Sequence, residues 1–60
     1  MTNMKMTRIY FTGITEMGCC IQNAMVVIPE DYTMNQMAKA IKTAGYKMFM
    51  LSTMKKFVEI

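Results

Sequence analysis

The stretch "YTMNQMAKAIKTAGYKMFML", Tyr32 to Leu51, contains the start and stop signals of a helix that is followed by a strand. Thr33 is in the position of an N-cap, and Gln36 can complete a capping box with it. Gly45 suits the left-handed residue that commonly follows the end of a helix. The sequence therefore predicts a helix that begins just after Thr33 and ends just before Gly45.

The predicted helix has one polar and one apolar face. Its polar residues are Asn35, Gln36, Lys39, Lys42 and Thr43. Its apolar residues recur at helical spacing and form one stripe, which consists of Met34, Met37, Ala38, Ile41 and Ala44. We expect this stripe to pack against a sheet, because an amphipathic helix must bury its apolar face.

A β-hairpin is expected before the helix. Thr7–Thr15 and Cys19–Ile28 are rich in residues that favour strands, and Gly18 between them can form the turn. In the second segment, Gln22 and Asn23 fall on opposite faces, so neither face is wholly apolar there. We expect that part of the strand to lie near an edge or a turn.

The segment after Gly45 predicts a third strand, and its end has two alternatives. Either one bent strand runs to the C-terminus, or "STMKK" turns the chain and Phe57–Ile60 forms a short fourth strand. We expect a two-layer α+β fold of order ββαβ(β), with an antiparallel sheet of three to four strands and one helix packed on one face. Residues 1–60 are expected to form a single domain in which residues 1–6 are flexible.

The composition is that of a folded domain: 53% of the 60 residues are hydrophobic and 18% are charged. The longest apolar runs, Ala24–Ile28 and Met48–Leu51, are far shorter than the roughly 20 residues of a membrane helix. The N-terminus contains neither an apolar core segment nor a cleavage site of a secretory signal. We therefore expect no membrane partner and a cytoplasmic location.

The sulfur-containing residues raise the question of a metal site. Cys19 and Cys20 are the only cysteines, and there is no histidine to complete a zinc site, so we expect two reduced, partly buried thiols. Three methionine pairs have spacings that resemble those of Cu(I) ligands: Met4/Met6, Met34/Met37 and Met48/Met50. Methionine at helical spacing is usually packing material, so we expect core or interface packing and neither a metal nor another cofactor.

Catalytic chemistry finds little support in the sequence. Histidine, the commonest general base, is absent. The acidic residues are expected in turns, at the helix start or at the C-terminus: Glu16, Glu30, Asp31 and Glu59. No nucleophile elbow, phosphate-binding loop or dinucleotide fingerprint occurs. We therefore expect a protein that is not an enzyme.

One local pattern points to nucleic acid. "RIYFTGI", Arg8–Ile14, resembles the first RNA-contact strand of the RNA-recognition motif, and "AGYKMFML", Ala44–Leu51, resembles the second. The resemblance implies that Tyr10 and either Tyr46 or Phe49 would stack on bases. The element order differs, because that family places a helix after its first strand and this sequence predicts a hairpin. Nucleic-acid binding by a basic, aromatic sheet surface is therefore the alternative function.

The leading interpretation is a small protein-interaction module. A lone helix covers one face of the sheet, so the other face and the edges are free to bind a partner. The composition is typical of AT-rich genes, which favours a phage or mobile-element protein that inhibits or modulates a host protein. The partner would be a host protein or a second copy in a homodimer. The candidate partner-binding residues are Tyr10, Phe49, Met50, Lys39, Lys42 and Lys47.

Overall fold

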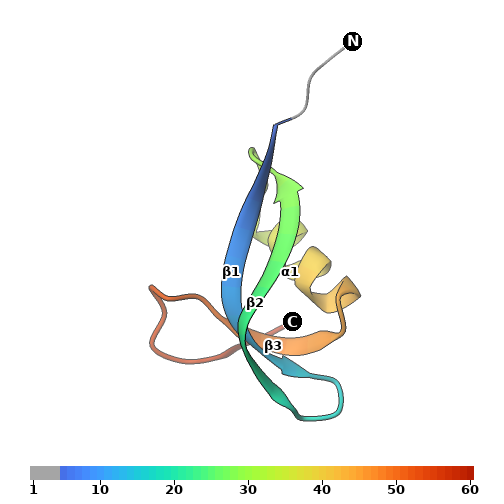
Figure 1. Cartoon of the computed structure of the whole chain (residues 1–60), viewed down its shortest axis with the longest axis vertical. Helices are drawn as coiled ribbons and strands as arrows, with labels where there is room; N and C mark the ends of the chain where they lie inside the picture. Colours follow the sequence, from blue (N-terminus) through green and yellow to red (C-terminus); the bar gives the residue numbers. More distant parts are fainter. Residues whose placement is uncertain (1–4) are drawn as a thin grey trace.

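The computed structural model describes residues 5–60, and within them it contains one sheet and one helix (Figure 1). The elements are β1 (Met6–Thr15), β2 (Cys20–Pro29), α1 (Met34–Thr43), β3 (Tyr46–Met50) and β4 (Val58–Glu59). The strands are antiparallel in the order β2-β1-β3-β4, and α1 packs on one face of the sheet. The expected two-layer α+β fold is confirmed, and the short fourth strand shows that "STMKK" turns the chain.

The long β1–β2 hairpin forms one end of the sheet. Its turn contains Gly18 at a φ of 88°, a backbone conformation that glycine adopts without steric cost. The register changes between Phe11, which pairs with Ala24, and Gly13, which pairs with Ile21, so β2 contains a bulge. Asn23 lies in this bulge at a φ of 59°. The polar pair in β2 thus marks an irregularity in an edge strand, as the sequence predicts.

The ends of α1 lie where the sequence predicts them. The Gln36 N–H donates to Thr33 Oγ1 at 3.2 Å, and the Thr33 N–H donates to Gln36 Oε1 at 2.8 Å, which completes the capping box. Gly45 has a φ of 104°, and its N–H donates to the Lys42 carbonyl at 2.9 Å. These bonds satisfy backbone groups that a helix end leaves without partners.

The core lies between α1 and the sheet. Met37 and Ile41 have no exposed surface, and they form a cluster with buried residues from three strands: Phe11, Ala24, Val26, Ile28 and Phe49. The predicted apolar stripe is wrong at its two ends, because Met34 and Ala44 are exposed. These residues are the first residue and the C-cap of α1, and only the middle of the stripe lies over the core.

At the start of the described residues, the chain joins the sheet. The Glu30 N–H donates to the Lys5 carbonyl at 2.9 Å, and Met6 begins β1. Of the segment expected to be flexible, residues 1–4 lie outside the described residues. None of the helices within residues 5–60 has the length and hydropathy needed to cross a membrane.

Candidate functional site

The sheet face that α1 does not cover is the main candidate surface, and we call it the outer face. Side chains alternate along β1, so Phe11 faces the core and Tyr10 points to the opposite side. Tyr10 is 61% exposed and is paired across the strands with Met25, which is 44% exposed. Four exposed apolar or aromatic side chains define the outer face: Met6, Tyr10, Met25 and Val27.

Paired strands hold the backbone of these residues in register. Tyr10 and Met25 lie in the regular part of the β1–β2 ladder, where the register is continuous from Met6 to Phe11. Arg8 pairs with Val27 in the same ladder, so its charged side chain lies on the outer face beside the apolar ones. The arrangement combines an aromatic ring, a thioether and a cation on one face of the sheet.

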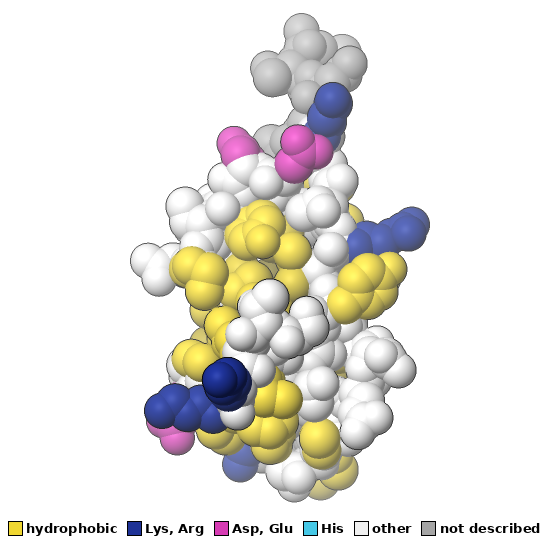
Figure 2. All heavy atoms as spheres, turned by 90° about the vertical axis from the view of Figure 1, so that its left-hand side faces the viewer, with side chains coloured by type: hydrophobic (Ala, Val, Ile, Leu, Met, Phe, Trp, Pro, Cys, Tyr) yellow, Lys and Arg dark blue, Asp and Glu magenta, His cyan; other side chains and the backbone are white. Residues whose placement is uncertain are grey.

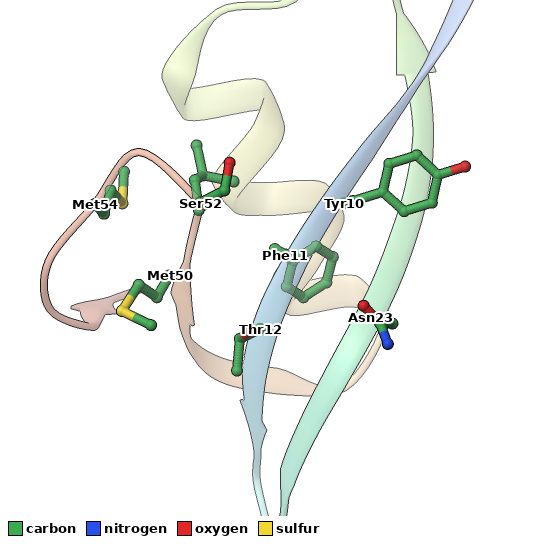
Figure 3. A pocket seen from close by; sticks show the side chains of 8 residues that line it. Tyr10, Phe11, Thr12, Asn23, Met50, Ser52 and Met54 are labelled. Carbon is green, nitrogen blue, oxygen red and sulfur yellow. The ribbon is translucent and has the colours of Figure 1, made fainter.

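A shallow hollow of about 200 Å³ adjoins the outer face (Figure 3). In this view Tyr10 and Asn23 lie on one side of β1, whereas Met50 and Met54 lie on the other. Thr12 is the small residue between them, and it pairs with Met50 at the end of β3. The hollow is smaller than the 300–1,000 Å³ typical of small-molecule sites.

The structure brings only some of the predicted site residues together. Tyr10 and Met50 both line the hollow. Phe49 was predicted to contact a partner, and this is wrong because its side chain is 2% exposed within the core. It pairs with Gly13 on the helix-covered side of the sheet, which is why it is buried.

The predicted lysines lie apart from the outer face. Lys39 and Lys42 are exposed on α1, in the layer that covers the opposite face of the sheet, and Lys47 is exposed on β3. Figure 2 shows the side of the molecule on which β1 lies in Figure 1. There some basic side chains lie next to an acidic one at the lower left, other basic side chains lie apart, and further acidic side chains lie near the top. The charges on this side thus form no continuous basic patch.

The two cysteines do not lie where the sequence places them. Cys19 and Cys20 are exposed and unpaired, so the expectation of partly buried thiols is wrong. They lie at the turn of the hairpin and the start of β2, outside the core. Within residues 5–60 there is no group of three or more His, Cys, Asp or Glu residues that could hold a metal ion. Met37 is buried whereas Met34 is exposed, and Met4 lies outside the described residues.

Three of the four outer-face residues were not selected from the sequence: Met6, Met25 and Val27. For Met25 and Val27, the signal that could have identified them is the alternation along β2. It places these two residues on one face of the strand and Ala24, Val26 and Ile28 on the other. This alternation shows which residues share a face. It does not show which face the helix covers, because both are apolar.

Comparison with known protein families, with curated proteins and with solved structures finds no match to this chain. Its own surface is therefore the basis for assigning a function.

Proposed function

We propose that the protein is a non-enzymatic interaction module that binds another protein through the outer face. The observation that supports this function is the cross-strand pair of Tyr10 and Met25, both exposed on a regular part of the sheet. Aromatic residues, methionine and arginine are enriched in protein interfaces. Tyr10, Met25 and Arg8 provide all three types on one face.

The shape of the site also favours a protein partner. The outer face presents exposed side chains of two adjacent strands, and the adjoining hollow of about 200 Å³, which Tyr10 lines, can accept a side chain of a partner. A partner protein would cover the exposed side chains of Met6 and Val27 and thereby remove apolar surface from water. The amino-acid composition is typical of AT-rich genes and favours a phage or mobile-element origin for this chain. The partner would then be a host protein that this chain modulates.

Site-specific photo-crosslinking tests this function. A photoreactive phenylalanine analogue replaces Tyr10 in one version of the protein and Asn35, exposed on α1, in a control version. In a lysate of the source cells we expect a discrete crosslinked protein with the first version and none with the second. Excess unlabelled wild-type protein should remove the product.

Three outcomes would contradict the proposal. These are the absence of any crosslinked protein at Tyr10, an equal product at Asn35, and a product that nuclease treatment removes. The last outcome would favour the alternative function, binding of nucleic acid.

A further inference from the structure

A second surface feature lies between the free edge of β2 and one flank of α1, and we call it the edge groove. It has a volume of about 570 Å³, within the range of peptide and ligand sites. One wall is the C-terminal part of β2, Val26 to Pro29. The other wall is formed by residues of α1 and its C-cap: Gln36, Lys39, Ala40, Thr43 and Ala44.

The strand wall of the groove offers backbone hydrogen-bonding groups. The Glu30 N–H donates to the Lys5 carbonyl, so residue 30 turns its backbone groups toward β1. Backbone groups alternate in direction along an antiparallel strand, so Met25 and Val27 direct theirs away from β1, and Val27 lines the groove. β2 is an edge strand of the sheet within residues 5–60, and no strand there pairs with this side of it.

The usable edge is short and well bounded. Asn23 interrupts the regular strand with its bulge at one end. Pro29 at the other end has no backbone N–H to donate. Between them, Met25 and Val27 provide two N–H donors and two carbonyl acceptors, which is enough to align one short added strand.

The helix wall has space for the side chains of such a strand. Ala40, Thr43 and Ala44 are small, and the Thr43 hydroxyl already donates to the Lys39 carbonyl at 2.8 Å. This wall is therefore mostly apolar toward the groove. Among the described lining residues, Lys39 has the single charged side chain, and it is exposed at the rim.

We propose that the edge groove binds an extended segment of a partner protein as an additional strand beside β2, with an acidic side chain of that segment next to Lys39. Strand addition obtains its affinity from main-chain hydrogen bonds and its specificity from alternate side chains. Side chains on one side of the segment pack against Ala40 and Ala44. Those on the other side lie beside Val27.

A second copy of this chain is a less suitable occupant. Pairing two β2 edges would bring two α1 helices and two Lys39 ammonium groups to one interface, where like charges repel. A carboxylate from a different protein instead complements Lys39. The groove shares Val27 with the outer face, but its other wall lies on α1 and Tyr10 does not line it. This inference therefore goes beyond the interaction proposed above and can fail independently of it.

The test begins with a random linear peptide library selected on the wild-type protein. We expect enriched peptides to alternate apolar residues and to contain an acidic residue. The most enriched peptide, labelled with fluorescein, is then titrated with variants and followed by fluorescence anisotropy. Val27→Pro removes the backbone N–H of Val27, which points away from β1, and so leaves the hydrogen bonds between β1 and β2 in place. It should weaken binding of the peptide about tenfold or more.

Matched variants separate backbone, charge and outer-face effects. Val27→Ala shortens the same side chain but keeps the N–H, so affinity should change by less than about threefold. Lys39→Glu should weaken binding about fivefold or more, whereas Lys42→Glu, outside the groove, should have a much smaller effect. Tyr10→Ala should leave the affinity unchanged, which distinguishes this site from the outer face.

Amide hydrogen exchange provides a second readout. It uses the wild-type protein, so no substitution can disturb the fold. The amides of Met25 and Val27 should exchange rapidly in the free protein and become protected when the peptide is added. Failure to enrich peptides, retained affinity in folded Val27→Pro, or unprotected amides in the complex would overturn the inference. A homodimer in sedimentation that Val27→Pro dissociates would replace the partner segment with a second copy.

Discussion

Gly13 in β1 has no side chain, and this allows two aromatic rings to pack close to its backbone. It is paired with Phe49, and the ring of Tyr46 lies over it. The rings of Phe11 and Tyr46 meet edge to face with centroids 5.1 Å apart. A Cβ on Gly13 would lie 2.8 Å from Tyr46 Cε1 and 2.9 Å from Phe11 Cε2, so both rings would have to move. Close approach of the rings is thus the reason for glycine at this position.

Gly13→Ala should therefore lower the free energy of unfolding by about 1–3 kcal/mol, the usual cost of overpacking a core. Urea denaturation followed by circular dichroism measures the change. In a Tyr46→Ala background the same substitution should cost less, because the nearer of the two obstructing rings has been removed and only that of Phe11 remains. Equal costs in the two backgrounds would mean that the ring of Tyr46 is not the obstacle.

At the scale of elements, α1 was easier to predict than the strand faces. Its ends are determined by local bonds of Thr33, Gln36 and Gly45, and these bonds depend only on neighbouring residues. The strands alternate correctly in the sequence, but alternation alone could not decide whether Phe49 or Met50 faces the helix. That choice depends on register with β1, and a shift of one residue exchanges the two faces.

The buried face of α1 provides an element-scale prediction. Ile41→Asp should unfold the protein, because it places an unpaired charge at a position with no exposed surface. The expected penalty of several kcal/mol is comparable to a total stability of about 5 kcal/mol for a small domain. Thermal melting by circular dichroism measures the effect.

Met34→Asp is the matched control, since Met34 is 59% exposed on the same helix. It should leave the melting temperature nearly unchanged. A folded Ile41→Asp variant with a normal melting curve would contradict the packing of α1 on the sheet.

At the scale of the whole molecule, the sequence predicted parts of a site but not their arrangement. Tyr10 and Met50 were selected from the sequence and lie at one hollow. Lys39 was also selected from the sequence, but it lies on α1, at the rim of the edge groove. The groove exists only because α1 packs beside the free edge of β2, and no local pattern of residues specifies that contact.

The distribution of charge over the whole molecule leads to the last prediction, which separates protein binding from nucleic-acid binding. Seven basic residues are offset by four acidic ones, and Arg8 on the outer face lies in a different layer from Lys39 and Lys42. Phosphate contacts supply most non-specific affinity for nucleic acid, and that affinity falls steeply with salt. Random single-stranded DNA and RNA should therefore bind only at micromolar or weaker affinity at about 150 mM salt, as measured by fluorescence anisotropy. Raising the salt severalfold should abolish this binding, whereas the protein captured at Tyr10 should remain bound. Submicromolar, sequence-dependent binding that is lost in a folded Tyr10→Ala variant would instead establish that the exposed ring stacks on bases, and the outer face would then be a nucleic-acid surface.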